Sequence, residues 1–397
     1  METVQNSTET FMYLAENLRN ISKTTGLLKE KLITARTIVA TDHPLVRADG
    51  RRDDARGIQQ LLRLADKKGI HIIFPPGRYI LRRPLRLREH TYLEASDAAV
   101  FLKEHHGPML LNLRRRDRMR HYTGNGNIII SGGKWNANYP AFGGGTSFVF
   151  AHAKNILIEK VQLLEHGGGH AIELNAVQHA EVRDCQFCGY DDRNGKRSYS
   201  EAIQLDLAKT RRVFPWGGSV FDQTACQDIW IHHNYFGPSQ TKGSWGRAVG
   251  SHAATADRWH ERIYITDNKM KETLQWAVRA FSWRDVVCFH NCLDTCGGGI
   301  AIHLNHVDGR NDTDVNNRPT GRSNPVKNIL LIKNQISGGG GYGSAVRLKG
   351  SQTSPIEGAI LYDNYVDMYK GKKAHITDTA YRRVSVKKKA DICVNKM

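Results

Sequence analysis

The sequence lacks any apolar stretch of the roughly eighteen residues that a transmembrane helix requires. Its first residues, METVQNSTET, also lack the basic and then apolar profile of a secretory signal peptide. These two absences argue against a membrane span and against classical secretion. We therefore expect a protein made in the cytoplasm.

Cysteine is scarce, with 7 residues in a chain of 397. The number is odd and the residues are spread through strand-like segments, which predicts a reducing compartment and no disulfide framework. Cys185 and Cys188 form a C-x-x-C pair, but their flanks are typical of a strand and no second pair has zinc-site spacing. The sequence predicts no metal site and no cofactor.

Acidic residues are few relative to basic ones: 39 Asp and Glu stand against 57 Lys and Arg, a net charge of +18. Such a surface attracts polyanions, which include nucleic acid, teichoic acid and uronate-rich or otherwise acidic polysaccharide. Charge alone does not choose among them. The length and the 40% content of hydrophobic residues permit a large core in one long domain or two ordinary ones.

What the sequence contains in abundance is a repeated frame, a short alternating strand followed by a tight turn and the start of another strand. Its seven copies begin at Ile156, Val182, Ile229, Ile263, Val286, Ile329 and Ala359. Five copies carry Asn in the turn, at positions 234, 268, 291, 334 and 364. Asn tolerates left-handed backbone and can hydrogen-bond to an Asn one layer away, so we expect an Asn ladder at one corner of a solenoid.

A second repeated strand precedes these frames, as in Ala171–Asn175 and Ala202–Asp206. Period-two alternation turns its aliphatic residues inward and leaves two outward columns running up the solenoid. The first predicted column is Glu173, Gln204, Gly250, Arg279, His303 and Arg347, and the second is Asn175, Asp206, His252, Phe281, Asn305 and Lys349. Because these columns collect acids, His, Arg and an exposed Phe, we predict that they line a functional groove.

The segment before the repeats carries Ala48-Asp49-Gly50, Asp53-Asp54, an apolar helix-like stretch from Gly57 to Leu62, and Phe74-Pro-Pro-Gly-Arg-Tyr79. These motifs resemble the N-terminal cap of the pectate-lyase-like β-helix superfamily, and cap and repeats together cover about residues 45–370. The resemblance implies an all-β, right-handed parallel β-helix, a single-stranded solenoid with an N-terminal α-helical segment and a capping helix. We expect a helical assembly segment at 1–45, the β-helix at 46–375 and a basic C-terminal tail or cap at 376–397.

The N-terminal segment has a helical stripe at Phe11, Leu14, Leu18 and Ile21 that continues at Leu28 and Leu32 after a break near Gly26. One interpretation is a helix packed on the protein's own cap. The other is an assembly helix, because many members of the superfamily are trimeric phage tailspikes or appendages. The resemblance implies a homotrimer, other virion proteins as partners, and a location in a virion or release by lysis.

Three loops are expected to wall the groove, at 188–200, 207–227 and 306–325. Four carboxylates fall near them, and paired carboxylates are the machinery of glycoside hydrolysis. We predict catalysis by Asp206, Asp222 and His252, with a further set that binds substrate. This set is Glu173, Glu201, Gln204, Arg279, His303, Arg347, Lys349, Trp216 and Phe281. Trp245, Trp259 and Trp276 are further candidate sugar platforms, and His260 is a further candidate for proton transfer.

Elimination is the alternative chemistry, in which His252 removes the proton beside a uronate carboxylate that Arg279 neutralises. The known enzymes of the superfamily do not decide the matter. The sequence has no N-T-D motif, Gly250-Ser251-His252 departs from the G-H-G of polygalacturonases, and the later strands lack the acids of calcium-dependent pectate lyases. We expect a depolymerase of an acidic polysaccharide, with hydrolysis ahead of elimination. A glycan-binding appendage without catalysis is the next hypothesis, and nucleic-acid binding is disfavoured because no nucleic-acid motif occurs.

Overall fold

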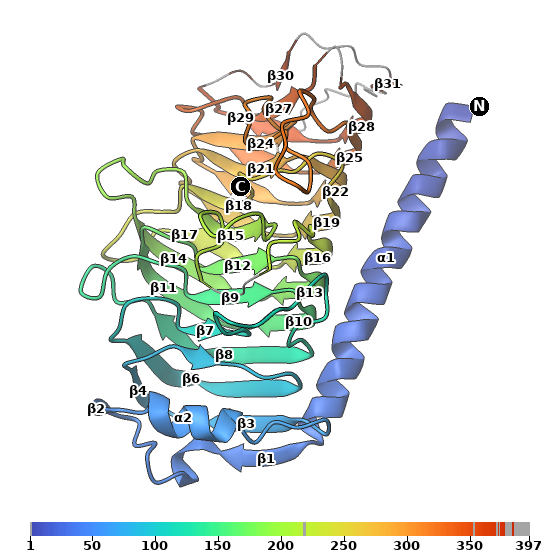
Figure 1. Ribbon diagram of the computed structural model, residues 1–397. Coiled ribbons are helices and arrows are strands. Elements are labelled where there is room, and N and C mark those ends of the chain that lie inside the picture. The colour runs from blue at the N-terminus through green and yellow to red at the C-terminus, as the bar shows by residue number, and fades with distance from the viewer. Residues whose placement is uncertain are drawn as a thin grey trace.

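The computed structural model describes residues 2–216, 220–351, 354–370, 372, 374–377 and 383–384, and the side chains of residues 12–216, 220–351, 354–370 and 372. Its strands wind into a parallel β-helix whose coils stack along one axis (Figure 1). Three faces run along this solenoid, and we number them in the order in which each coil passes through them. Most of the predicted C-terminal segment 376–397 lies outside the described residues.

Faces 1 and 2 form one large parallel sheet that turns through a corner. Face 1 consists of β1 (Arg36–Val39), β3 (Ile70–Phe74), β10 (Lys154–Glu159), β13 (Gln178–Arg183), β16 (Gln227–His232), β19 (His260–Thr266), β22 (Trp283–Phe289), β25 (Val326–Ile332), β28 (Ile356–Tyr362) and β31 (Arg383–Val384). Face 2 consists of β2 (Asp49–Asp53), β4 (Gly77–Leu81), β11 (Gln162–Gly167), β14 (Gln186–Asp191), β17 (Tyr235–Gly237), β20 (Lys269–Lys271), β23 (Cys292–Asp294), β26 (Gln335–Ser337) and β29 (Tyr365–Asp367). Two long strands, β6 (Thr91–Lys103) and β8 (Ile128–Asn136), belong to both faces.

Face 3 is the second sheet, whose strands were predicted to carry the groove columns. It consists of β5 (Leu85–Arg86), β7 (Leu110–Leu111), β9 (Phe148–Ala151), β12 (Ile172–Asn175), β15 (Glu201–Asp206), β18 (Arg247–Gly250), β21 (Trp276–Phe281), β24 (Gly298–His303), β27 (Val346–Lys349) and β30 (Ala374–Thr377). Its inward residues, such as Ile172, Leu174 and Ile203, join one continuous core with those of the other faces. The parallel β-helix prediction is confirmed.

The corner between faces 1 and 2 carries the expected Asn ladder. Asn234 Nδ2 donates to Asn268 Oδ1 (3.0 Å), and the same bond repeats from Asn268 to Asn291 (3.0 Å), from Asn291 to Asn334 (2.9 Å) and from Asn334 to Asn364 (2.8 Å). The left-handed residue of each turn is the one before the Asn, for example His233 and Asp267, and not the Asn itself. The Asn is therefore selected for its amide and not for its backbone conformation.

The predicted groove columns are present on every strand from β12 to β27 except β24. Glu173 pairs with Gln204, Asn175 with Asp206, and Gly250 with Arg279, as expected. On β24, however, His303 lies beside Phe281 of β21 and Lys349 of β27, so its predicted place between Arg279 and Arg347 was wrong by two residues. The apolar alternation from Ile300 to Leu304 fits both registers, and an even shift leaves each residue on the same side of the sheet.

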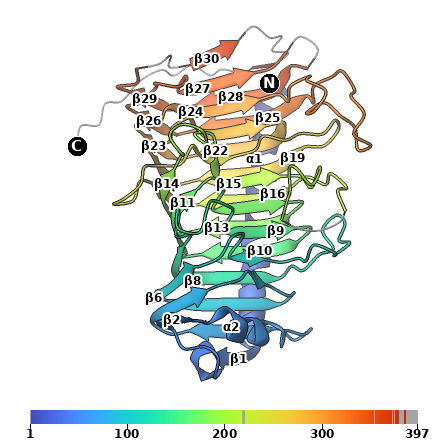
Figure 2. The same cartoon turned by 60° about the vertical axis from the view of Figure 1, so that its left-hand side comes forward.

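The N-terminal helix α1 (Glu2–Ile33) continues through Gly26 without a break. It runs along face 1 and not onto the cap, on the right of the solenoid in Figure 1 and behind it in Figure 2. Leu14 and Ile21 are buried against Tyr264, Val287, Leu330 and Ile332, and Leu28 and Leu32 are buried against Tyr92, Ile129 and Leu157. The apolar stripe thus covers the protein's own sheet. Phe11 lies outside the described side chains.

The cap motifs close the first coil. Helix α2 (Ala55–Leu62) buries Ile58, Leu61 and Leu62 over the open end of the core. Asp54 Oδ1 accepts hydrogen bonds from the backbone nitrogens of Arg47 (2.6 Å) and Ala48 (3.1 Å), and its Oδ2 accepts one from Ile80 (3.0 Å). One buried carboxylate therefore ties three backbone segments together, which explains why the predicted cap needs an acid at this position.

Candidate functional site

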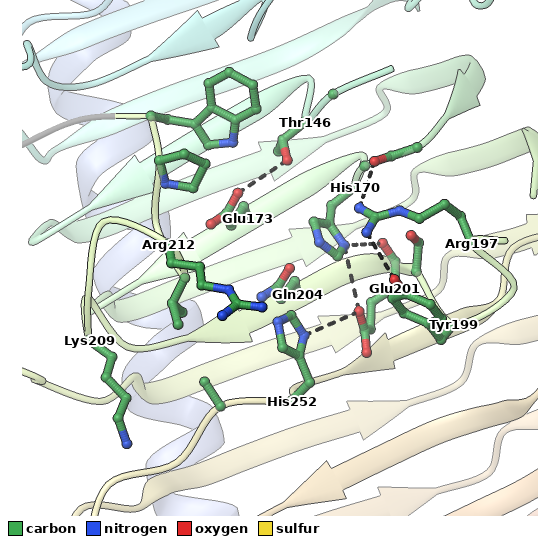
Figure 3. Close-up of a pocket in the computed structure, with 18 of the residues that line it drawn as sticks. Thr146, His170, Glu173, Arg197, Tyr199, Glu201, Gln204, Lys209, Arg212 and His252 are labelled. Carbon is green, nitrogen blue, oxygen red and sulfur yellow. Dashed lines mark hydrogen bonds and ion pairs between the residues drawn. The ribbon is translucent and has the colours of Figure 1, made fainter. Parts of the chain in front are cut away.

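A cavity of about 620 Å³ opens on the outer side of face 3 over β12, β15 and β18. The predicted loops form its walls: Arg197 and Tyr199 come from the first loop, Lys209 to Trp216 from the second, and Arg310 and Asn311 from the third. Glu173, Gln204 and His252 lie at its floor (Figure 3). The floor is rigid because these residues stand on or directly after paired strands, whereas the walls are loops.

Glu173 projects outward from β12 and is only 2% exposed. Its carboxyl accepts hydrogen bonds from Thr146 Oγ1 (3.1 Å) and Asn175 Nδ2 (2.8 Å), both neutral donors. Burial raises the pKa of Glu173 to about 7, and the nearby Asp206 acts in the same direction. Glu173 can therefore hold a proton near neutral pH.

Glu201, at the start of β15, is an ionised carboxylate in the same cavity. Its Oε1 lies 2.5 Å from Arg247 Nη1, and its Oε2 lies 3.6 Å from His170 Nδ1 and 3.9 Å from His252 Nδ1. Burial alone would raise the pKa of Glu201, but Arg247 and His252 outweigh it and hold the pKa well below its usual range. Two glutamates in one cavity are thus poised in opposite protonation states.

His252 follows β18 and bridges two carboxylates. Its Nδ1 faces Glu201 Oε2 and its Nε2 faces Asp206 Oδ2, each at 3.9 Å, while 46% of its side chain remains open to the cavity. Burial disfavours the imidazolium, but Glu201 and Asp206 more than compensate and raise the pKa of His252. The predicted proximity of Asp206 and His252 is therefore present.

Asp206 itself does not reach the cavity. It is fully buried, accepts a hydrogen bond from the Leu207 backbone nitrogen (2.8 Å) and is bonded to the Gln204 side chain. Burial raises the pKa of Asp206 to about 6. The geometry makes it a positioning partner of His252 and not a group that touches substrate, which departs from the predicted catalytic role.

Asp222 was predicted to fold back over the groove, and it does not. Its carboxylate accepts hydrogen bonds from the backbone nitrogens of His121 (2.7 Å) and Thr224 (3.2 Å) and lies 3.9 Å from His152 Nδ1. It holds together the loops after β7 and β15, outside the cavity lining. Nothing in the sequence fixes the direction in which a long loop folds, and this carboxylate stabilises the loop itself.

The residues predicted on the later coils also lie outside this cavity. These are Arg279, Phe281, His303, Arg347 and Lys349. Phe281 is fully buried and not exposed, because the Arg279 guanidinium packs 4.5 Å above its ring. Burial and the surrounding cations hold the pKa of His303 well below its usual value. A role for these residues in binding substrate stays a prediction.

Of the predicted aromatic platforms, Trp216 lines the cavity. Trp245 and Trp276 are buried, and Trp259 is covered by Arg284 at 4.6 Å. Proton transfer by His260 is not supported, since burial lowers its pKa to about 3 and its Nδ1 accepts a bond from the Cys226 backbone nitrogen.

Sequence reasoning missed four wall and floor residues, His170, Arg197, Lys209 and Arg212. Arg212 is exposed, extends toward Gln204, and forms no ion pair with a carboxylate among the described residues (Figure 3). Arg197 donates to the Gly168 carbonyl (2.7 Å). Lys209 turns away and donates to the carbonyl oxygens of Ala254 and Arg310, joining two walls. The basic run Lys209-Thr-Arg-Arg212 was the available signal.

Within the described part of the chain, no group of three or more His, Cys, Asp or Glu side chains is arranged to hold a metal ion. The C-x-x-C pair is divided between environments: Cys185 is buried, whereas Cys188 is half-buried on β14. Burial raises the pKa of Cys185 to about 12, which disfavours the thiolate that a metal would need.

No family model matches the chain. A curated relative, plasmin and fibronectin-binding protein A of Streptococcus pneumoniae, is 24% identical over 287 residues. The match covers 64% of this chain and only 39% of that protein.

Solved structures match over more of the chain. The S. pneumoniae surface protein and adhesin PfbA aligns with a TM-score of 0.64 and 19% identity, covering 86% of this chain and 96% of that one. A Thermotoga maritima exopolygalacturonase gives a TM-score of 0.58 and 12% identity, covering 89% and 95%. An alginate lyase from Paenibacillus gives 0.54 and 11%, covering 87% and 99%.

These matches define the fold: the chain is a right-handed parallel β-helix. At such identities they carry no activity across. Among the described residues, no helix combines the length and apolar character that crossing a membrane would demand.

Proposed function

We propose that the protein is a depolymerase that hydrolyses glycosidic bonds of an acidic polysaccharide in the face 3 cavity. The observation that supports this proposal is that one cavity holds two carboxyl groups in different protonation states. Glu173 has a pKa of about 7, and Glu201 is an ionised partner of His252. Environments that shift the pKa values of two titratable groups in opposite directions are typical of the general acid and the general base of glycosidases.

In this proposal Glu173 donates its proton to the glycosidic oxygen as the bond to the anomeric carbon breaks. Water adds to that carbon and gives a proton to His252, while Glu201 and Asp206 stabilise the resulting imidazolium. Glu201 and Asp206 also raise the pKa of His252, which makes it a stronger base. Because water attacks the anomeric carbon directly in this proposal, the configuration at that carbon is inverted. Glu173 and Glu201 are the carboxylates that line the described cavity.

The substrate class follows from charge. Arg197 and Arg212 stand on the walls, and Arg212 has no carboxylate partner among the described residues. Guanidinium groups bind carboxylates in a bidentate manner, so a uronate or another acidic sugar supplies the missing anion. Trp216 offers an apolar surface for a sugar ring beside them.

The test is incubation with a panel of acidic polysaccharides, including polygalacturonate and alginate, while reducing ends and the ultraviolet absorbance of unsaturated uronates are followed in parallel. Reducing ends without absorbance support the proposal. Absorbance with cleavage indicates elimination by His252, and the hydrolytic mechanism fails. Glu173→Gln and the exposed-site control Glu357→Gln exclude a contaminating activity, because only the former should abolish cleavage.

A glycan-binding function without catalysis is the second candidate. It is favoured by the likeness to PfbA, which is described as a surface adhesin. It predicts tight binding to one acidic polymer with neither product formed, and equal binding by the wild type and Glu173→Gln.

The homotrimer, the virion partners and release by lysis stay predictions. The stripe that motivated assembly is occupied, because Leu14, Ile21, Leu28 and Leu32 pack on face 1 of the same chain. Light scattering of the full-length chain decides the point, since a mass of 44.7 kDa at micromolar concentration would contradict the trimer.

A further inference from the structure

A second cavity, of about 470 Å³, lies near the N-terminal end of the solenoid. Residues at the end of α2, residues on β5, and the segments that follow β5 and β7 form its lining. In Figure 1 α2 lies at the lower front of the molecule with β7 above it, on the same side as β12 and β15. No part of the reaction proposed above uses this cavity.

The lining is rich in cations: Arg63, Lys67, Arg86, Arg88 and Arg114. Within the described ranges, none of these five lies within ion-pair distance of a carboxylate. The arginine-rich loop Arg114–Arg120 borders the cavity and adds further positive charge. These cations outnumber the three acids of the lining, and such an excess of like charge creates a local field that attracts anions.

The acids that line the cavity are already engaged by other groups. Asp66 accepts from the Lys68 backbone nitrogen (2.8 Å), Glu89 accepts from Asn127 Nδ2 (3.1 Å), and Asp117 accepts from the Arg114 backbone nitrogen (2.7 Å). They stabilise turns and the corner of the solenoid. Asp117 also acts electrostatically on Arg86, but in the described part of the chain no ion pair joins these three acids to the five cations, so the guanidinium groups can still bind a ligand.

Two of the arginines are held by backbone oxygens and not by acids. Gln59 brackets the backbone of Arg86 with two hydrogen bonds (2.8 and 3.1 Å), and Arg86 Nη1 donates to the Leu113 carbonyl (2.9 Å). Arg88 Nη1 donates to the Arg63 carbonyl (2.7 Å). Burial lowers the pKa of Arg86 and Arg114 lowers it further, so the cluster is under mutual repulsion that an anion would relieve.

An apolar ridge separates this cavity from the first one. Met119 lines the second cavity, Trp216 lines the first, and both pack against one cluster with Leu113 and Phe214. At about 4.8 Å per coil, the two to four coils between β5 or β7 and β12 or β15 span roughly 10–19 Å. That is the length of a few sugar residues, so one chain crossing the ridge reaches both cavities while a short oligosaccharide fills one.

We propose that this basic cavity is a second binding site that holds a carboxylate-bearing segment of the same acidic polysaccharide away from the bond that is cleaved. The identity of the polymer rests on the proposed function, whereas the anion-binding site is inferred from the charges of the residues that line it. Arg86 and Arg114 provide the contacts, with Arg88 beside them.

The experiment compares Arg86→Gln/Arg114→Gln with the matched variant Arg19→Gln/Arg36→Gln, which removes two exposed charges on α1 and β1. Equilibrium binding of polygalacturonate and of digalacturonate is measured at near-physiological salt, with Glu173→Gln as the background so that no polymer is cleaved. We expect the cavity variant to bind polygalacturonate roughly tenfold more weakly, equivalent to about 1.4 kcal/mol. The matched variant should change by less than about twofold, and the affinity for digalacturonate, which is too short to cross the ridge, should be unchanged.

Equal weakening in both variants would show a general charge effect and overturn the proposal, as would unchanged polymer binding. Duplex DNA that outcompetes polygalacturonate and depends on the same arginines would also overturn it, by identifying a nucleic-acid site. If the double variant does not fold, Arg114→Gln carries the test, because that side chain is exposed. Failure of the proposed function is distinguishable: no polymer is then cleaved by the wild type, while the binding difference persists.

Discussion

Faces 1 and 3 are alike on their inner sides and differ on their outer sides. Both turn aliphatic residues into one core, but face 1 is covered by α1 whereas face 3 carries a cavity. Under α1 the buried acids are paired: Glu159 with Lys29 and Arg183, and Glu181 with His232 and Thr25. On face 3, Glu201 Oε2 and Asn175 Oδ1 are buried without a hydrogen bond.

The difference teaches that buried charge alone does not mark a site in this fold. Glu159 and Glu181 have lowered pKa values because neighbouring cations outweigh burial, which is the signature of a structural ion pair. Glu173 has a raised pKa because its partners are neutral. The face that keeps a protonated acid is the one equipped for chemistry.

The largest expected effect is at Glu173. Glu173→Gln keeps the hydrogen bonds of the side chain but removes the proton donor, so turnover should fall by about 10²–10⁴-fold. Initial rates of reducing-end formation measure this loss. Glu181→Gln, the matched change under α1, should leave turnover within about threefold; an equal loss in both variants would erase the distinction between the two faces.

The next effect concerns stability. Ile21 is 1% exposed in the interface between α1 and face 1. Ile21→Ala should cost about 2–5 kcal/mol of the free energy that holds α1 to the sheet. Hydrogen exchange should report faster exchange confined to α1 and face 1, with activity retained. If activity were lost along with the hydrogen-exchange protection of α1, the two faces would be coupled.

The pH dependence follows from His252 and Glu173. Activity requires neutral His252, so it should rise as pH increases through the raised pKa of His252. It also requires protonated Glu173, so it should fall, about tenfold per unit, above a pH of about 7.

Asp206→Asn tests the positioning role of Asp206 on the same profile. It removes a charge that raises the pKa of both His252 and Glu173, so both limbs should move to lower pH. A lower activity at every pH without a shift of either limb would indicate a direct catalytic role for Asp206.

The smallest expected effects are changes in KM, which we compare between the two ends of face 3. Arg212→Gln should raise KM about tenfold for an acidic substrate with little change in kcat, because it removes an unpaired cation from the cavity wall. Arg347→Gln, on a later coil outside the cavity, should change KM by less than about twofold. A comparable rise in both would extend the binding groove up to β27.

The sequence by itself determined the architecture. Strand alternation, the Asn turns and the cap motifs depend on local periodicity and on residues one coil apart, so they can be read along the chain. The same periodicity located Glu173, Gln204 and His252 on one face, whereas Glu201 was predicted from its place after the 188–200 loop. It also predicted the walls of the cavity, since long insertions between strands have to fold outside the solenoid.

Only the tertiary structure decided which of those residues meet. The direction of the 207–227 loop took Asp222 away from the groove and brought Arg212 into it. An even register shift moved His303, and a stripe suited to a partner proved to fit the protein's own sheet. In each case several arrangements satisfy the same local pattern. The choice among them rests on side-chain packing and charge pairing between residues far apart in sequence, which periodicity does not encode.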